Sequence, residues 1–199
     1  PSTFADLFDV ENFPGRRTFY SWSHPGVIEA ALLADGVAPD DLYPLDLDRA
    51  FAKLDTIKDH IIWWEGGAQS QQLLASGEAP IGLFWNGRLY ALEAEGAPVG
   101  ISWDHNITAA DALVVPRGTK NKEAAMRYIA EATSARAQAD FAAASAYAPI
   151  NLESPDLMEA SIRDSLPDAQ TAVQVNADLA YWAEHREEIG TRWYAWKAR

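Results

Sequence analysis

The pattern of apolar and polar positions divides the chain into short strands and amphipathic helices that follow one another. Apolar or β-prone runs of strand length lie at residues 18–22, 61–64, 79–85, 99–103 and 110–115. Runs of this kind, bounded by Gly, Pro, Asn or Asp, are typical of strands. Several segments between them have the three- and four-residue apolar spacing of helices. Strands that alternate with helices predict an α/β fold in three layers.

Helix boundaries are indicated by capping residues. Ser23 is expected to cap a helix over residues 27–34, and Asp46 or Asp48 a helix that reaches about residue 60, because such side chains accept hydrogen bonds from first-turn amides. The remaining helical segments are predicted at residues 1–9, 71–76, from a turn at 86–87 through 94, 123–133, 135–144, 156–165 and 177–198.

Charge and cysteine content exclude several kinds of partner and site. The formal charge of −13 disfavours nucleic acid and anionic membrane surfaces and favours cationic or partly cationic solutes. The chain has no cysteine, which excludes disulfides and thiolate chemistry. Its four histidines are far apart and no nucleotide-binding or metal-binding motif occurs, so we expect no metal and no cofactor. No apolar run is long enough to insert into a membrane.

Tryptophan is abundant, with eight in 199 residues. Indole rings fill cores, and they also form walls of ligand sites, so both uses are open. In the last predicted helix, the spacing of Trp182, Ile189, Trp193 and Trp196 places them on one apolar face. That stripe favours packing on the chain's own sheet, and the alternative is an interaction protein whose C-terminal helix docks a partner.

The segment LFWNGRLY places Trp85 three residues before Arg88, at the start of a predicted helix. A guanidinium beside first-turn amides is suited to an anion, and an indole can form the adjoining wall of a cleft. The alternative is that Arg88 pairs with Glu93 or Glu95 outside any cleft. The segment therefore predicts an anion site, with a surface ion pair as the competing interpretation.

Five phrases occur in order along nearly the whole chain: TFADLFDVENFPGRR, LASGEAPIGLFWNGRLYALEAEG, AADALVVPRGTKNKEAAMRYI, AYAPIN and LPDAQTA. Together they resemble the substrate-binding proteins of bacterial ABC importers, in the branch that includes spermidine/putrescine-binding proteins. The resemblance implies a type II periplasmic-binding-protein-like fold, with two α/β lobes that close on a solute about a hinge. It implies transport without catalysis and a membrane permease as partner. The location would be periplasmic, or extracytoplasmic with a lipid anchor in a Gram-positive cell.

The resemblance also implies a division of the chain. Residues 1–109 would form the second-lobe α/β core, and residues 110–156 would belong to the first lobe or hinge. Residues 157–199 would be C-terminal helices that pack on the second lobe. Most of the N-terminal lobe would then lie outside this sequence, so a longer gene product is expected.

Four candidate ligand-binding residues follow from matching the phrases residue by residue. Trp85 resembles the Trp of the family's W-N-G phrase, Asp111 its amine-binding Asp, and Tyr147 the aromatic residue of its G-Y-x-P phrase. Asp178 falls near a polar ligand contact in the last segment. All four are what the resemblance implies.

The predicted solute depends on which charges face the cleft. Polyamine binders place two carboxylates after the first strand of the second lobe, where this chain has Ser23 and Gly26. Ser23 and the preceding Trp22 are further candidate ligand-binding residues. A diamine would leave one buried ammonium unpaired, which is costly. Arg88 and Asp111 offer one positive and one negative anchor. We therefore predict a γ-aminobutyrate-like zwitterion, with a polyamine as the alternative.

An enzyme is the remaining alternative. Acid pairs such as Asp104 and Asp111 could in principle hydrolyse glycosides in an α/β cleft. No nucleophile–base motif accompanies them. Turnover of a candidate solute would distinguish an enzyme from a receptor.

Overall fold

Three short parallel strands organise the first of two units in the computed structural model of the chain. β1 (Arg17–Tyr20) lies between β2 (Ile61–Trp64) and β3 (Ile81–Gly82), and all pairs are parallel. β1 is buried along its whole length, as expected for the central strand of a covered parallel sheet. The carboxyl ends of the three strands therefore lie at one edge.

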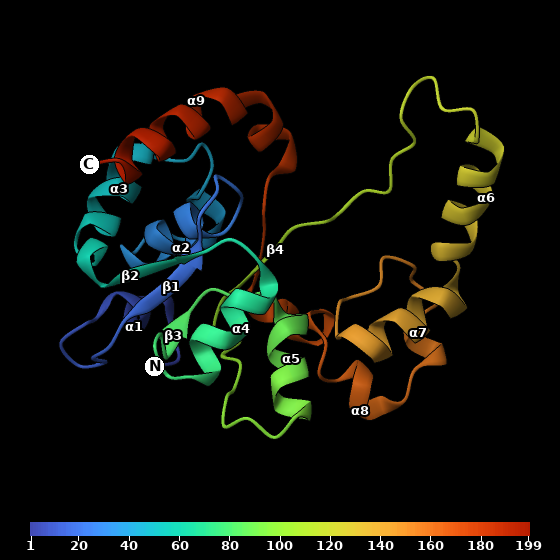
Figure 1. Cartoon of the computed structure of the whole chain (residues 1–199), viewed down its shortest axis with the longest axis horizontal. Helices are drawn as coiled ribbons and strands as arrows, with labels where there is room; N and C mark the ends of the chain where they lie inside the picture. Colours follow the sequence, from blue (N-terminus) through green and yellow to red (C-terminus); the bar gives the residue numbers. More distant parts are fainter. The chain divides into compact units, whose positions relative to one another are not determined.

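The structure describes residues 1–199, apart from the side chain of Val173. Unit 1 comprises Pro1–Ala109 with Val173–Arg199, and unit 2 comprises Ala110–Ala172 (Figure 1). Residues 157–172, which we expected beside the C-terminal helices, lie in unit 2. The assignment of the units to lobes of a two-lobed protein stays a prediction.

Helices cover both sides of the sheet in unit 1. Figure 1 shows α2 (Val27–Ala34), α3 (Leu47–Asp55) and α9 (Leu179–Lys197) on one side, and α4 (Gly67–Ala75) and α5 (Asn86–Ala94) on the other. This layered arrangement confirms the predicted α/β fold. Short elements complete unit 1: α1 (Phe4–Phe8), the 3₁₀ helices η1 (Pro39–Asp41) and η2 (Lys58–His60), and a two-stranded parallel sheet of β4 (Asn106–Thr108) and β5 (Gln174–Asn176).

The apolar stripe of α9 is buried in the core of unit 1, as its spacing predicted. Trp182, Ile189, Trp193 and Trp196 are all at most 6% exposed. Trp196 stacks on Phe51 of α3 with a centroid distance of 5.6 Å. The tryptophans of this helix therefore hold α9 on its own unit. In the described part of the chain, no helix has the length and apolar composition to cross a bilayer.

A buried carboxylate joins α9 to α2. Glu29 is fully buried, and its oxygens accept hydrogen bonds of 2.7 Å from the Gly26 amide, the Tyr43 hydroxyl and the Trp182 indole. Three donors satisfy the carboxylate without a cation, which is the condition for burying such a group. Burial, and then the neighbouring Glu29 carboxylate, raise the pKa of Tyr43 above its ordinary value.

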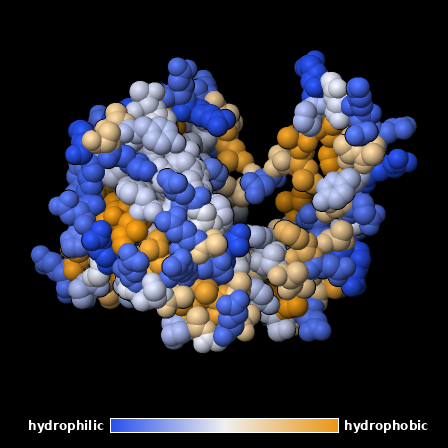
Figure 2. Space-filling view, viewed as in Figure 1, coloured by the Kyte–Doolittle hydropathy of each residue, from blue (hydrophilic) through white to orange (hydrophobic). Residues whose placement is uncertain are grey.

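Unit 2 consists of helices and connecting segments. Its α-helices are α6 (Lys122–Ala132), α7 (Ala135–Ser145) and α8 (Ala160–Arg163), and its 3₁₀ helices are η3 (Pro155–Leu157) and η4 (Pro167–Val173). The last residue of η4, Val173, is where the chain re-enters unit 1. Figure 2 shows hydrophobic side chains gathered on the surface over α6 and α7. Among the large apolar or aromatic residues of α6 and α7, Met126, Tyr128 and Phe141 are 50%, 67% and 58% exposed. Unit 2 therefore has several large apolar side chains exposed on neighbouring helices.

Several predicted boundaries are wrong. Residues 99–103 and 110–115 are not strands, and of residues 79–85 only Ile81–Gly82 pair. Residues 156–165 are not one helix but parts of η3 and α8. The predicted helix from Asp46 stops at Asp55, and Lys58–His60 form η2. Neither β4 nor β5 was predicted.

Two helix starts also differ from the prediction. Gly26, not Ser23, is the N-cap of α2, and its φ of +132° is accessible to glycine but strained for other residues. Asn86 and Gly87 are not a separate turn, because they form the first turn of α5. A turn signature and a helix start share the same residue types, so these sequences did not distinguish them.

Arg17 ties the N-terminal segment to β1, and its replacement by Met is expected to lower the free energy of unfolding by about 3 kcal/mol. Its buried guanidinium donates to the carbonyls of Leu7, Asp9 and Gly15 at 2.8, 2.9 and 2.7 Å. Met would keep the packing but leave these acceptors without their donor. Urea denaturation measures the change, and a loss below about 1 kcal/mol would show that the three bonds do not stabilise the fold.

Candidate functional site

The carboxyl edge of the three-stranded sheet is where a ligand is expected to bind in an open α/β fold. β1 leads into Trp22, β2 ends at Trp64, and β3 leads into Trp85. Because the three strands are adjacent and parallel, the residues at or just after their carboxyl ends lie close together. The sheet therefore brings together three tryptophans that are far apart in sequence.

These three indoles contact one another. Trp64 lies edge-on to Trp22 at 5.3 Å and to Trp85 at 5.1 Å between ring centroids, and Trp22 lies 6.1 Å from Trp85. Trp64 is fully buried, Trp22 is half-buried, and Trp85 is 39% exposed. The buried ring of Trp64 thus packs against the more exposed rings of Trp22 and Trp85. The rings of Trp22 and Trp85 are the part of this aromatic cluster available to a ligand.

Polar atoms of the same edge lack partners. In unit 1, among the residues described, the Ser23 hydroxyl and the Trp64 indole nitrogen are buried and make no hydrogen bond. Buried polar groups are normally satisfied, so each such atom requires an explanation. Trp64 faces the rings of its neighbours, where an N–H can interact with a π face. Ser23 lies one residue beyond Trp22, and its hydroxyl is buried and not exposed to a ligand.

Arg88 extends this edge with a positive charge. It lies in the first turn of α5, where its amide donates to the Trp85 carbonyl at 2.9 Å, and it is exposed. Within unit 1, no described carboxylate forms an ion pair with Arg88, so the alternative pairs with Glu93 and Glu95 do not occur. The guanidinium is thus available to an anion.

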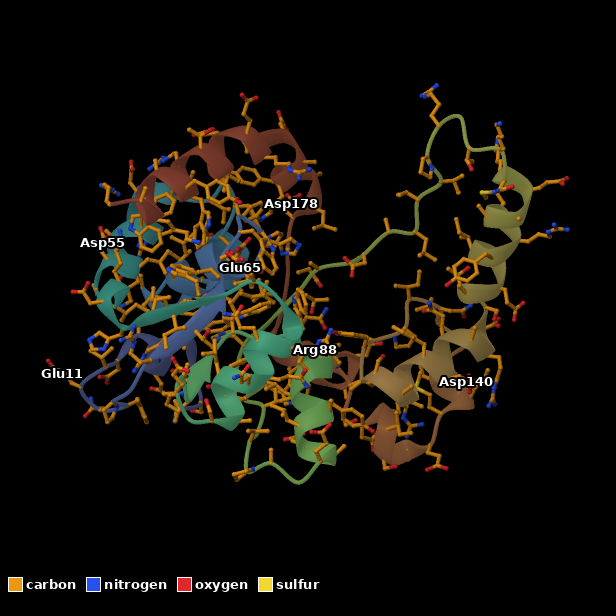
Figure 3. All side chains as sticks on the ribbon, viewed as in Figure 1. Glu11, Asp55, Glu65, Arg88, Asp140 and Asp178 are labelled. Atoms are coloured by element: carbon orange, nitrogen blue, oxygen red, sulfur yellow. The ribbon has the colours of Figure 1, made fainter. Side chains whose placement is uncertain are left out.

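The guanidinium of Arg88 lies directly on Gly67, the first residue of α4. A Cβ atom at Gly67 would lie 2.7 Å from Arg88 Cζ and 3.0 Å from Nη2. Gln71, one turn further along α4, donates to the Arg88 carbonyl at 3.1 Å. Figure 3 shows Arg88 at the end of α5 that lies next to α4. Arg88 therefore lies beside the positive end of the α4 dipole, and both attract an anion.

The loop that carries Trp22 and Ser23 is fixed by Tyr20. The Tyr20 hydroxyl donates to the Pro25 carbonyl at 2.5 Å and accepts from the Val27 amide at 3.0 Å. Gly26 leaves room for this hydroxyl, which a side chain there would displace. Burial, and then the charge of Glu29, raise the pKa of Tyr20 well above its ordinary value, so the phenol stays neutral.

The other candidate residues lie elsewhere. Asp178 is the N-cap of α9, and its Oδ1 accepts from the Tyr181 amide at 2.9 Å, which gives it a structural role in unit 1. Asp111 and Tyr147 belong to unit 2, where Asp111 is exposed and Tyr147 stacks on Phe141 at 6.3 Å. Their place in the same site as Arg88 stays a prediction. Tyr20, Trp64 and Gly67 were not predicted from the sequence, because their roles depend on contacts between separate elements.

The site contains no arrangement suited to a metal. Among the residues that the structure describes, no group of three or more His, Cys, Asp or Glu side chains converges on one point. What the edge offers in unit 1 is aromatic surface and a guanidinium. These groups suit an organic anion with an apolar part.

Comparison with known proteins shows the family of the chain. The chain matches the model of the bacterial extracellular solute-binding protein family over residues 1–174. It is 36% identical over 206 positions to the gamma-aminobutyric acid-binding protein of Pseudomonas aeruginosa, covering all of this chain and 58% of that protein. The structure of the Atu4243-GABA receptor is 69% identical and has a TM-score of 0.94, with all of this chain and 62% of that one covered. The chain thus spans less than two thirds of either relative.

The polyamine-binding branch is more distant. The spermidine/putrescine-binding protein of Streptococcus pneumoniae is 15% identical with a TM-score of 0.64, over 99% of this chain and 62% of that chain. At this identity the likeness shows the fold alone, so the branch named from the sequence phrases was too specific. The fold and the family match over residues 1–174 support a broader conclusion. This chain belongs to the bacterial extracellular solute-binding protein family, whose members serve ABC importers.

Proposed function

We propose that the chain is the solute-binding part of a receptor that captures γ-aminobutyrate or a similar ω-amino acid. Two relatives with 36% and 69% identity over the whole chain are named for binding γ-aminobutyric acid. The observation that carries the proposal is the Arg88 guanidinium, which has no carboxylate partner in unit 1 and lies against the first turn of α4, three residues after Trp85 in the sequence. A carboxylate is the natural occupant of that position.

The methylene chain of the solute would lie on the aromatic cluster. Trp85 is exposed at this edge, and Trp22 is half-buried beside it. Indole faces bury methylene groups and also attract a nearby ammonium, by about 0.5–2 kcal/mol.

The ammonium of the solute would pair with Asp111 of unit 2, and Tyr147 would form the opposite wall. An ammonium held in a closed cleft needs a carboxylate, because a desolvated charge without a partner is costly. An ω-amino acid suits two separate anchors better than an α-amino acid, whose charges lie closer together. The lobes of a hinged receptor would bring the two anchors to the solute when they close.

Unit 2 would be part of the other lobe of a longer receptor. The two γ-aminobutyrate-binding relatives of the chain are longer than the chain itself. Several large apolar side chains of unit 2 are exposed, including Val114, Ile150 and Leu152 at 78%, 67% and 93%. Such a surface is expected to pack against further residues of the same lobe. The receptor would act outside the cytoplasmic membrane without catalysis and deliver its solute to the permease of an ABC importer.

A polyamine is the second candidate, since solved spermidine/putrescine-binding proteins share the fold. Titration calorimetry of the full-length gene product with γ-aminobutyrate and with putrescine separates the two. We expect saturable binding of γ-aminobutyrate in the micromolar range or tighter and no heat from putrescine. Tight putrescine binding without an amino-acid signal would exclude the zwitterion.

Gly67 provides a test of the Arg88 position, because Gly67→Ala is expected to weaken γ-aminobutyrate binding about tenfold while the fold is kept. The added methyl group overlaps the guanidinium, which is the mobile end of a long side chain and must move away. A displaced guanidinium loses its two parallel hydrogen bonds to a carboxylate. Gly66→Ala is the matched control, since its added Cβ has no neighbour within 4 Å. Equal affinity in both variants would contradict the assigned role.

A further inference from the structure

The carbonyl of Ser21, at the end of β1, accepts two hydrogen bonds from the last turns of α9. The Lys197 ammonium donates at 2.6 Å and the Trp193 indole nitrogen at 3.1 Å. The amide of Ser21 donates to the Trp64 carbonyl at 2.9 Å, which extends the pairing with β2 by one residue. Ser21 is therefore held from two sides immediately before the loop that carries Trp22 and Ser23.

Lys197 is partly buried and is held in place by two contacts. Its ammonium lies 4.4 Å from the centroid of the Trp63 ring, on β2. Burial lowers its pKa and the charge of Glu65 opposes that shift, yet no described carboxylate of unit 1 pairs with it directly. Figure 3 labels Glu65, which follows β2 in the sequence. The carbonyl of Ser21 and the ring of Trp63 are thus the groups that stabilise this cation, and they orient it toward the loop.

A shift of Ser21 would move the rings of the site. Trp22 is the next residue, and its ring contacts Tyr20, Trp64 and Trp85 at centroid distances of 5.4, 5.3 and 6.1 Å. Because the three indoles form one packed group, a change in the path of the chain at Ser21 changes the wall that Trp22 presents. The hydrogen bonds of the Tyr20 hydroxyl join the far end of the same loop, at residues 24–27, and none of them reaches Ser21 or Trp22.

We propose that Lys197 is a positioning residue for the solute site: by anchoring the Ser21 carbonyl, the end of α9 sets the orientation of Trp22. This inference rests on the proposed function for its affinity readout. It assigns the C-terminal turn of α9 a role beyond packing. The expected consequence is a site whose affinity depends on a side chain that does not touch the solute.

Lys58 provides a matched control. Its ammonium donates to the Trp196 carbonyl at 2.7 Å and lies 4.7 Å from the centroid of the Trp196 ring. The two lysines thus make the same pair of interactions, one carbonyl bond and one cation–π contact, in the same unit. Of the two lysines, only Lys197 donates to the carbonyl of Ser21, the residue before Trp22. A purely structural role would give Lys58→Met and Lys197→Met the same consequences.

The experiment compares the full-length gene product with its Lys197→Met, Lys58→Met and Lys197→Arg variants. The solute-free readout is amide hydrogen exchange of residues 21–26. We expect protection in Lys197→Met to fall about tenfold, the size of one lost charge-assisted hydrogen bond, with Lys58→Met and Lys197→Arg close to the parent. γ-Aminobutyrate affinity is expected to follow the same order, while urea midpoints of the two Met variants agree.

The outcomes separate the two proposals. Unchanged exchange in Lys197→Met, or equal loosening of residues 21–26 in Lys58→Met, overturns the positioning role. If the parent protein binds no γ-aminobutyrate but the exchange pattern follows the expected order, the proposed function fails and the anchoring of the loop by Lys197 stands. If exchange follows the order but affinity is equal in all variants, Lys197 fixes the loop without tuning the site, and the positioning proposal is wrong.

Discussion

Arg88→Gln is expected to weaken γ-aminobutyrate binding by at least about a hundredfold, since truncating one member of a desolvated charge pair costs about 3 kcal/mol. Stability should change little, because Arg88 is exposed and has no ion pair in unit 1. The expected effect is specific to the carboxylate end of the solute. n-Butylamine, which lacks the carboxylate, should bind the parent and Arg88→Gln equally weakly. Titration calorimetry on the full-length gene product measures all four affinities.

Arg49→Gln is the matched control for Arg88. Arg49 is an exposed arginine of the same unit, and its guanidinium pairs with Asp35 at 2.6 Å. Its replacement should leave both solutes unaffected. If Arg88→Gln weakens butylamine as much as γ-aminobutyrate, the guanidinium shapes the site without holding the carboxylate, and the predicted orientation of the solute is wrong.

Asp111→Asn is expected to have an effect of similar size on the other end of the solute. The ammonium would keep a hydrogen-bond acceptor but lose its countercharge in a closed cleft, at a cost of about 3 kcal/mol or a hundredfold in affinity. Butyrate, which lacks the ammonium, should bind the parent and Asp111→Asn alike. The combination of the two variants with the two singly charged solutes assigns each anchor to one end of the solute.

Asp104→Asn distinguishes this account from the enzyme alternative. Asp104 is an exposed carboxylate seven positions before Asp111, and in the acid-pair hypothesis both would be required. In the receptor account, Asp104→Asn binds γ-aminobutyrate normally. Loss of binding in both Asn variants, or conversion of a bound solute to product, would favour the acid pair.

The sequence predicted the parts of the fold that depend on local patterns. The run at 61–64 became β2 without a change of boundary, and the stripe that includes Trp193 is buried, because buried apolar runs and helical spacing are local properties. Residues 99–103 have the composition of a strand but no partner strand in the described part of the chain. Composition therefore predicted a strand where the tertiary structure provides no partner.

The site was predicted only where one segment carries it. Trp85 and Arg88 are three residues apart, so their proximity follows from the sequence, and the lack of an ion pair to Glu93 or Glu95 agrees with the cleft hypothesis. Trp64 and Gly67 enter the site through the pairing of β2 with β1 and the packing of α4 on α5. No sequence pattern reports such contacts, since they depend on strand order.

Tyr20 shows how a local signal can mislead. Ser23 has the residue type of a helix cap and is followed by proline, yet the Tyr20 hydroxyl occupies the space beside Gly26 and bonds the first amide of α2. Ser23 therefore does not cap α2, and its buried hydroxyl makes no hydrogen bond in the described part of unit 1. The physical reason is a side chain from the preceding strand, which cap statistics do not include.

The most direct test of the central claim is a crystal structure of the full-length gene product with γ-aminobutyrate bound. The account predicts the carboxylate of the solute on Arg88 and its ammonium on Asp111, each at about 2.7–2.9 Å, with the methylene chain between Trp85 and Tyr147. A solute bound away from Arg88, or side chains of Arg88 and Asp111 directed away from a common cleft, would contradict it.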